Sequence, residues 1–594
     1  MAKEIDLLNP EKILSILQSK GLISEEDARK ILVTYDSAKA RILKRIKEEN
    51  EGGEPLPWEV IPETGIKSSL TGKPLSEEEI LKVVAEELNI PYEKIDPVKL
   101  DLNFSSKYIT RPFARKHNLV PLREEGEYLV VATSNPFNLE AISTLANTSK
   151  KKIKLVLSSR KEIDKIVRDL MGFRSSVEKA SSSLSSTFDF GNLEQYVKMR
   201  ADRELEATDS YIINAVDYML RYALDQRASD IHMEPKRNEG IIRFRIDGVL
   251  HTVYRVPRVV HNAMVARIKA IGKLDIAEKR KPQDGRLKTK YRDREVEIRI
   301  STMPVAFGEK VVLRLLDPKF MFKDLHELGL SGKDLSTFQK FIQHTHGIIL
   351  VTGPTGSGKT TTLYSVLKKL DSPGVNIITI EDPIEMVYEG FNQINVNPSV
   401  GLDFAQALRH ILRQDPDIIM VGEIRDYETA RNAIQAALTG HLVLSTLHTN
   451  DAPSAITRLI DIGIEPFLIA STLIGVVAQR LVRTICPYCK EKIEVEAGEF
   501  RNLGVKIGGE HSRVTVYRGK GCSKCRYTGY LGRTAIFEIL PVDDEIRKLI
   551  AAKAPEDEIR KAAMKKGMQT LKVAGVKKVL NGETTIEEVL RVTL

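Results

Sequence analysis

The sequence predicts a multidomain α/β protein whose largest domain contains a doubly wound parallel sheet. A glycine-rich loop at residues 353–358 follows an apolar run, 348–351, and precedes a helix-forming stretch, 361–370. Further short apolar runs after this loop alternate with helical segments, which is typical of strands in a parallel sheet. At ~100 to 200 residues per domain, the 594 residues allow roughly three to five domains.

The glycine-rich loop has the composition and spacing of a triphosphate-binding loop. Its glycines let backbone amides turn toward phosphate oxygens, and the N-terminus of the following helix adds positive potential. Lys359 would reach the β and γ phosphates of ATP, and the Thr360 hydroxyl would bind Mg²⁺. The alternative is an ordinary glycine-rich turn, which the flanking strand and helix disfavour. We expect nucleotide to be bound by Gly353, Pro354, Thr355, Gly356, Ser357, Gly358, Lys359, Thr360 and Thr361.

Acidic residues follow two of the predicted strands. Glu423 comes after the run 418–421, and Glu381 and Glu385 come after the run 377–380. Ligands of open α/β sheets bind at the carboxyl ends of the strands, so these groups should lie near the loop. There Glu423 can hold Mg²⁺ or orient the attacking water, and one of the carboxylates can polarise that water. The alternative for each is a capping or surface carboxylate, and for Glu385 the two interpretations are equally strong.

Two histidines bracket the next predicted strand, residues 442–445. His441 precedes this strand and His448 follows it, among polar residues that continue to Asn450. A histidine taken alone is more often a hydrogen-bonded structural residue. The arrangement here suits a switch that senses phosphate equally well.

All four cysteines form two Cys-x-x-Cys pairs, Cys486 with Cys489 and Cys522 with Cys525. Together they offer four thiolates to a closed tetrahedral Zn²⁺ site, which would fasten a small subdomain and not catalyse. Free reduced thiols are the alternative, since a reducing cytoplasm disfavours disulfides.

Composition excludes some classes of protein. Hydrophobic residues are 42% and charged residues 29%, as in ordinary soluble proteins, and no apolar run approaches the ~20 residues of a membrane span. The N-terminus has no signal-peptide pattern, so we expect a cytoplasmic chain. The net charge of +9 is spread along the chain without interleaved aromatic residues, so nucleic acid is not favoured as a partner.

Shifts in composition divide the chain into segments. Glycine and proline break the helical pattern near residue 51, and serine enriches the stretch 174–192. The predicted divisions are a helical segment with a linker at 1–67, a small α/β module at 68–172, a flexible linker at 173–204, an α/β domain at 205–325, and the loop-bearing domain at 326–594, with the cysteine subdomain at about 483–530.

These motifs resemble, in their order, the secretion ATPases of bacterial type II secretion and type IV pilus assembly. The resemblance covers about residues 205 to 594 and includes the stretches 227–232 and 282–286. It implies a RecA-like ATPase core in a homo-hexameric ring that uses ATP, Mg²⁺ and Zn²⁺. It also implies that the 205–325 domain supplies arginines and that the 68–172 module binds a partner.

The resemblance assigns roles to particular residues. Lys359 and Thr360 hold phosphate and metal, Glu423 is the key residue of the second acidic motif, and Glu381 is a candidate for activating water. His448, in the segment from His441 to Asn450, is a further candidate catalytic residue. The family's arginine positions correspond to Arg299 and Arg314 before the core, and to Arg409, Arg413 and Arg425 within it.

The implied function is a motor for pilus or pseudopilus assembly at the inner membrane, driven by nucleotide-dependent rotation between domains. Its implied partners are the cytoplasmic domain of an inner-membrane platform protein and a membrane-anchored assembly protein, so the chain would be peripheral to the membrane. The cysteine pairs and the long N-terminal extension favour this over a retraction motor; a nucleic-acid translocating ring is the other alternative. No Arg-Leu-Gly repeat is evident near the N-terminus, which leaves cyclic di-GMP an unsupported partner.

Overall fold

The computed structural model describes residues 7–48, 54–69, 74–95, 102–167, 173, 176–181, 204–291, 294–317, 321–505, 507–509 and 512–593. The chain forms two compact units, one of Met1–Arg286 with Ile300–Leu313 and one of Leu287–Arg299 with Arg314–Leu594. Of the predicted linkers, residues 51–53 and 182–203 lie outside the described residues.

Helices form the beginning of the chain. They are α2 (Pro10–Ser19), α3 (Glu25–Glu48), α4 (Pro57–Val60) and α5 (Glu77–Leu88). Helix α2 starts where the Asn9 side chain accepts the N–H of Glu11, with Pro10 in the first turn. Trp58 is fully buried against apolar residues of α2 and α5, and the same core includes Leu157 of the following module.

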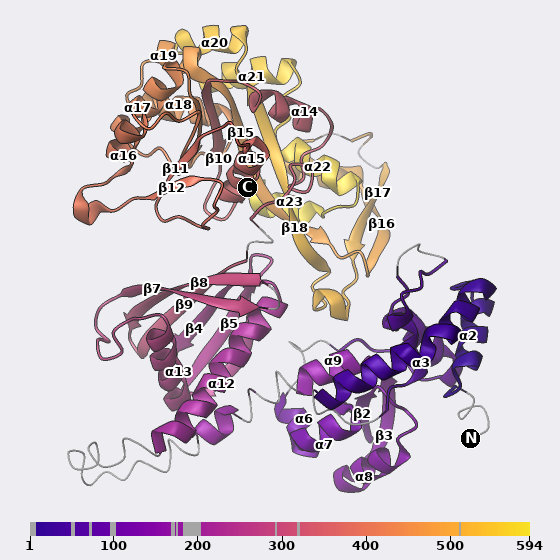
Figure 1. Ribbon diagram of the computed structural model, residues 1–594. Coiled ribbons are helices and arrows are strands. Elements are labelled where there is room, and N and C mark those ends of the chain that lie inside the picture. The colour runs from indigo at the N-terminus through magenta and orange to yellow at the C-terminus, as the bar shows by residue number, and fades with distance from the viewer. Residues whose placement is uncertain are drawn as a thin grey trace, which may run out of the picture. The chain divides into compact units, whose positions relative to one another are not determined.

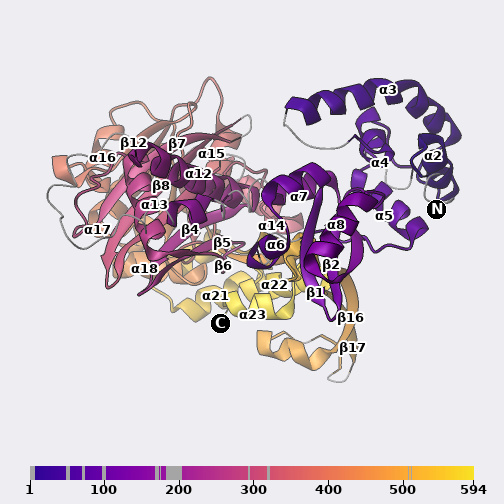
Figure 2. The ribbon, with the colours of Figure 1, turned by 90° about the horizontal axis from the view of Figure 1, so that it is seen from below.

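That module is a three-stranded sheet with short helices beside it (Figure 2). Strand β2 lies between β1 and β3, antiparallel to β1 and parallel to β3. The apolar runs 128–132 and 153–157 lie in β2 and β3. The elements are α6 (Leu102–Tyr108), α7 (Arg111–His117), β1 (Leu119–Glu125), β2 (Tyr128–Thr133), α8 (Leu139–Ser149), β3 (Lys152–Leu157) and α9 (Arg160–Lys165).

A six-stranded sheet follows, in the order β6-β5-β4-β9-β8-β7. Its strands alternate buried and less buried side chains, as β5 does from Glu239 to Ile246. Helices α12 and α13 pack together and against β4 (Figure 1). The elements are α12 (Glu204–Asp225), β4 (Ala228–Pro235), β5 (Glu239–Ile246), β6 (Val249–Pro257), α13 (Arg258–Ile271), β7 (Gln283–Tyr291), β8 (Arg294–Val305) and β9 (Gly308–Leu316).

The core domain contains a seven-stranded sheet in the order β12-β11-β13-β14-β10-β15-β18. Its first six strands are parallel and β18 is antiparallel to β15. Along β10, Ile348 and Leu350 enter one hydrophobic core while Ile349 and Val351 enter another. Cores on both faces explain why the strand is a continuous apolar run, and they confirm the doubly wound α/β prediction.

The elements of this domain are α14 (Gly332–Phe341), β10 (Gly347–Thr352), α15 (Lys359–Leu370), β11 (Ile377–Glu381), β12 (Asn392–Asn395), α16 (Phe404–Ile411), β13 (Ile418–Val421), α17 (Tyr427–Leu438), β14 (Leu442–Leu447), α18 (Pro453–Asp461), α19 (Pro466–Thr472), β15 (Leu473–Ile485) and β18 (Tyr530–Pro541). Between β15 and β18 comes the hairpin of β16 (Lys490–Glu496) and β17 (Arg513–Gly519). Four helices end the chain: α20 (Asp544–Ala551), α21 (Glu556–Lys565), α22 (Leu571–Leu580) and α23 (Ile586–Thr593).

The last two helices and the β16–β17 hairpin share a small core of their own. Phe500 and Val516 pack there with Val576 of α22 and Val589 of α23. Among the helices that the structure describes, none has the length and apolar character needed to span a membrane.

A buried ion pair fastens α23 to β15. Arg483 Nη2 lies 2.6 Å from Glu588 Oε1, and the Arg483 N–H donates to Glu588 Oε2 at 3.0 Å. Arg591 Nη2 is 2.9 Å from the same carboxylate. Burial opposes ionisation of Glu588, but the hydrogen bonds from Arg483 and Arg591 lower its pKa from 4.5 to about 2. The folded state therefore stabilises the ionised form.

We expect Glu588→Gln to lower the opening free energy of α23 by roughly 3 kcal/mol at pH 6. Because the folded pKa lies below the ordinary value, this stabilisation is present above about pH 4.5 and is lost as the pH falls through 2. Hydrogen exchange of the α23 amides measures the change. The control is Glu587→Gln at the exposed neighbouring position, and equal exchange in the two variants would contradict the prediction.

Candidate functional site

The glycine-rich loop joins β10 to α15 at the carboxyl end of a central strand. Gly353, Gly356 and Gly358 have φ values of 148°, 81° and 90°, a region that L side chains rarely adopt. A Cβ atom at Gly353 would lie only 2.6 Å from the Gln479 carbonyl oxygen. The loop therefore requires these glycines, both for its backbone conformation and because β15 approaches it closely.

Lys359 is buried at the first position of α15. Its Nζ donates to the carbonyl oxygens of Gly353 at 2.7 Å and Pro354 at 3.2 Å. Burial lowers the pKa of Lys359 to about 8; Glu423 opposes this shift and Arg480 adds to it. Within the described residues, no ion pair joins this ammonium to a carboxylate, and the buried Ser357 Oγ has no hydrogen-bond partner. An ammonium without a carboxylate partner and a buried hydroxyl without a hydrogen bond fit a polyphosphate and its Mg²⁺, with the Thr360 and Thr361 hydroxyls in the same first turn of α15.

Glu423 follows β13 and contacts an arginine and a histidine. Arg425 Nη2 lies 2.5 Å from Glu423 Oε1, and His448 Nε2 lies 3.3 Å from Glu423 Oε2. The Glu423 side chain is 12% exposed, whereas Arg425 is largely exposed. The structure thus brings together Glu423 and His448, which come from different strands, beside the loop lysine. His441 lies at the other end of β14, where its Nδ1 is 2.8 Å from the Ala436 carbonyl oxygen, a structural contact.

Glu381 lies at the end of β11 and is only 3% exposed. Its Oε2 accepts the Tyr364 hydroxyl at 2.6 Å, and its Oε1 accepts the Thr379 hydroxyl at 2.7 Å. Gln393 Nε2 also donates to Oε1, at 3.2 Å. Both carboxylate oxygens are therefore occupied by buried protein donors.

Glu385 is more accessible and faces an arginine. Arg299 Nη1 lies 3.3 Å from Glu385 Oε2, within the second compact unit. Arg314 is exposed on β9. The two arginines of α16 and its C-terminal end make other contacts: Arg409 Nη2 is 3.5 Å from Glu428, and Arg413 Nη2 is 2.9 Å from His410 Nδ1.

Sequence analysis missed two residues that border the loop, Gln479 and Arg480 of β15. Both are buried, and Gln479 Nε2 donates to the Ser357 carbonyl oxygen at 2.9 Å. The signal was present in the sequence, because a polar pair interrupts the otherwise apolar run from Leu473 to Val482.

The four cysteines converge at the ends of β15 and β18. Their sulfur atoms all lie within 4.8 Å of one another. The Sγ atoms of Cys486 and Cys522, and those of Cys489 and Cys525, are 3.8 Å apart. A tetrahedral site with Zn–S bonds of about 2.3 Å separates its sulfurs by about 3.8 Å, whereas a disulfide needs about 2.05 Å. The donor set and spacing fit a four-thiolate metal site.

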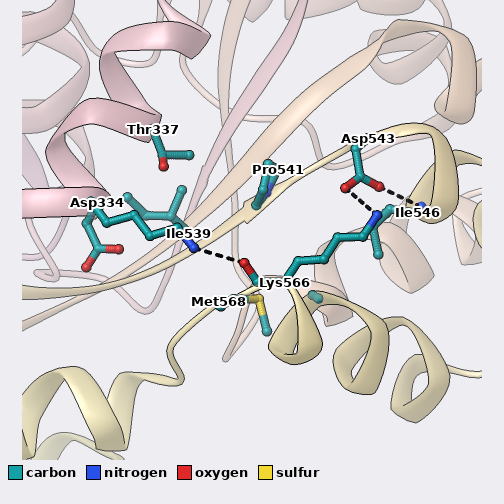
Figure 3. A pocket seen from close by; sticks show the side chains of 11 residues that line it. Asp334, Thr337, Ile539, Pro541, Asp543, Ile546, Lys566 and Met568 are labelled. Carbon is teal, nitrogen blue, oxygen red and sulfur yellow. Dashed lines mark hydrogen bonds and ion pairs between the residues drawn. The ribbon is translucent and has the colours of Figure 1, made fainter.

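A separate cavity of about 40 Å³ lies between α14, β18 and the segment after α21 (Figure 3). Lys333 Nζ donates to the Lys566 carbonyl oxygen at 2.9 Å, and Lys566 Nζ lies 2.7 Å from Asp543. The volume is comparable to the ~30 Å³ that one water occupies in the liquid. This cavity is too small for a nucleotide, and the Lys333 contact joins α14 to the segment after α21.

Comparison with known proteins places this site in a family. The family model described as type II/IV secretion system protein matches residues 205–591, and the MshEN domain model matches residues 88–177. The first match covers more than half of the chain and includes the loop, the acidic residues, the histidines and all four cysteines.

Curated relatives of two kinds are similar over most of their length. The type IV pilus assembly ATPase TfpB of Acinetobacter baylyi is 43% identical over 98% of this chain and 97% of that protein. Type II secretion system protein E of Xanthomonas campestris pv. campestris is 44% identical over 81% and 84%. The type IV pilus assembly ATPase PilB of Myxococcus xanthus is 43% identical over 82% and 86%. The chain therefore belongs to the type II/IV secretion system protein family of secretion and pilus assembly ATPases.

Proposed function

We propose that this chain is an ATP-hydrolysing motor that powers pilus or pseudopilus assembly at the inner membrane. The observation that carries the proposal is the buried Lys359 ammonium, which has only loop carbonyls as partners and lies beside Glu423. A buried cation without a counter-ion is costly unless an anion completes the site. Because the family consists of ATPases, we take ATP to be this anion. Relatives named for type II secretion and for pilus assembly indicate the process that hydrolysis would drive.

In this proposal the loop N–H groups and Lys359 hold the phosphates, and the Thr360 hydroxyl is a ligand of Mg²⁺. Glu423 holds the metal directly or through water, and His448 responds to the presence of phosphate through its contact with Glu423. Mg²⁺, when bound, neutralises phosphate charge. The protein's own contribution is to position these groups.

We propose Glu385, in place of Glu381, as the residue that activates water. Both oxygens of Glu381 accept hydrogen bonds, from Tyr364, Thr379 and Gln393, so its carboxylate is held as part of the fold. Glu385 is partly exposed, and among the described residues its side chain pairs with Arg299. A general base needs access to the proton that it removes, which favours Glu385.

The working assembly proposed is a homo-hexameric ring. Arg299 and Arg425 already contact site carboxylates, and Arg314 is the further arginine that we propose for nucleotide contact within or between subunits. Hydrolysis would change the angle between the 205–325 and 326–594 domains. The cytoplasmic domain of a platform protein would take up that motion, while the N-terminal module would dock a membrane-anchored assembly protein and keep the chain at the inner membrane.

Zn²⁺ is the metal proposed for the four cysteines. A closed thiolate site leaves no open coordination position, so the ion would join the two strand ends and perform no chemistry.

Steady-state ATP hydrolysis by the purified chain tests the function. We expect Glu423→Gln to lower turnover roughly 100-fold or more while ADP binding remains. The cytoplasmic fragment of the platform protein should stimulate the wild type, and single-stranded DNA should not. Glu465→Gln, an exposed acidic position before α19, is the matched control. Stimulation by DNA alone would identify a translocase, and wild-type turnover in Glu423→Gln would refute the role given to that residue.

A second comparison separates the two acidic candidates. Glu385→Gln should lower kcat by roughly 100-fold or more with little change in ATP affinity. Glu381→Gln should instead increase hydrogen exchange of the segment 382–391, because it weakens the buried contacts with Tyr364 and Gln393. If the Glu381→Gln protein folds but is inactive, and the Glu385→Gln protein remains active, then Glu381 and not Glu385 is the general base.

Metal analysis tests the cysteine site. The purified wild type should retain about one zinc ion after dialysis, as expected for a closed four-cysteine site, and Cys522→Ser should retain little. Limited proteolysis should then cut the segment between β15 and β18 more rapidly. Tyr488→Phe, an exposed change between two of the cysteines, should behave as wild type. The site would be refuted if the folded wild type, purified without chelators, contained no zinc and had four freely reactive thiols.

A further inference from the structure

Gln479 and Arg480 lie next to each other in the apolar middle of β15, against the phosphate loop. Gln479 is 1% exposed and Arg480 is 7% exposed. Buried carboxamide and guanidinium groups are costly unless hydrogen-bonded. Their partners therefore indicate which part of the structure they hold in place.

The Gln479 side chain joins the loop to the helix that follows it. Its Nε2 donates to the Ser357 carbonyl oxygen at 2.9 Å, and its Oε1 accepts the Thr362 hydroxyl at 2.7 Å. The carbonyl can only accept, which fixes the orientation of the amide. Ser357 and Thr362 flank Lys359 and Thr360, so one side chain spans the residues that face the nucleotide.

The loop also packs tightly on this strand. A Cβ atom at Gly358 would lie 2.8 Å from Gln479 Nε2, and one at Gly353 would lie 3.0 Å from Arg480 Nη1. Two of the three positive-φ glycines of the loop therefore lie where β15 leaves no room for a side chain.

Arg480 joins β15 to the segment that follows β14. Its Nη1 donates to the Gln479 carbonyl oxygen at 3.0 Å, and its Nη2 donates to the Asn450 carbonyl oxygen at 2.8 Å. These contacts connect Gln479 to the segment after β14 that carries His448. The Arg480 charge also acts on Lys359, lowering its pKa.

We propose that Gln479 is a positioning residue of the phosphate loop. By holding the Ser357 carbonyl oxygen away from the nucleotide, it leaves the loop N–H groups and Lys359 facing the polyphosphate. A glycine-rich segment loses conformational freedom when it is ordered, and a loop that is already ordered binds its ligand more tightly. The inference rests on the proposed nucleotide-binding role of this loop.

Gln479→Leu, which keeps the side-chain size but removes both hydrogen bonds, is the main test. It should weaken ADP binding by roughly 10- to 100-fold, because it leaves the Ser357 carbonyl buried without a donor. The KM for ATP should rise by a similar factor while kcat falls less. Thr362→Val removes one of the two bonds and should have a smaller effect in the same direction. Gln435→Leu on the exposed face of α17 is the matched control and should bind ADP as the wild type does.

Gln479→Glu provides a readout that a merely structural role would not change. An ionised glutamate cannot donate to the Ser357 carbonyl, but a protonated one can, and its shape matches glutamine. Its loss of ADP affinity relative to wild type should therefore be larger at pH 8 than at pH 6. A ratio that does not change with pH would count against the proposal.

The outcomes separate this inference from the proposed function. If the wild type binds neither ADP nor ATP, the proposed function is wrong. If the wild type binds and the folded Gln479→Leu protein binds equally well, only the positioning role is wrong. If Gln479→Leu does not fold, the test rests on Thr362→Val and on the pH series of Gln479→Glu. Wild-type ADP affinity in both of these variants would overturn the inference.

Discussion

The burial of the Lys359 ammonium beside β10 is the constraint on which the site depends. Taking a cation out of water is unfavourable, and two loop carbonyls compensate for only part of that cost. The depressed pKa of about 8 is the consequence. A polyphosphate placed over the loop would supply the missing negative charge, so the same burial that destabilises the empty site favours the occupied one. The central position of β10, with apolar cores on both faces, keeps the loop fixed while this happens.

Strand β15 connects three features that look separate in the sequence. Gln479 in its middle supports the phosphate loop, Arg483 pairs with Glu588 of the C-terminal helix, and Cys486 comes directly after its last residue. An extended strand rises about 3.3 Å per residue, so these points are spaced along roughly 20 Å of one rigid element. Fastening the cysteine end and the C-terminal helix therefore also limits how far the strand behind the loop can move.

Local patterns allowed most of the fold and part of the site to be predicted. The loop glycines, the apolar run of β10 and the cysteine pairs each signal their structure within a few residues. The role of Glu381 could not be judged in the same way, because two of the three donors to its oxygens, Tyr364 and Gln393, are 17 and 12 residues away. Gln479 is 122 residues from Ser357. Spacing predicts which residues could meet at a strand end, but only the tertiary structure determines which of them retain a free oxygen.

The three residues after β14 show how such a site can report its own occupancy. His448 contacts Glu423, the Thr449 N–H donates to Thr352 Oγ1 at 2.9 Å at the end of β10, and the Asn450 carbonyl accepts from Arg480. Consecutive residues are thus tied to the ends of two strands and to the support of the phosphate loop. A phosphate bound at Lys359 would repel the nearby Glu423 carboxylate, so it would act on the contact between Glu423 and His448. Because the segment leads directly into α18, a change at the phosphates has a short covalent route to the outer helices of the domain.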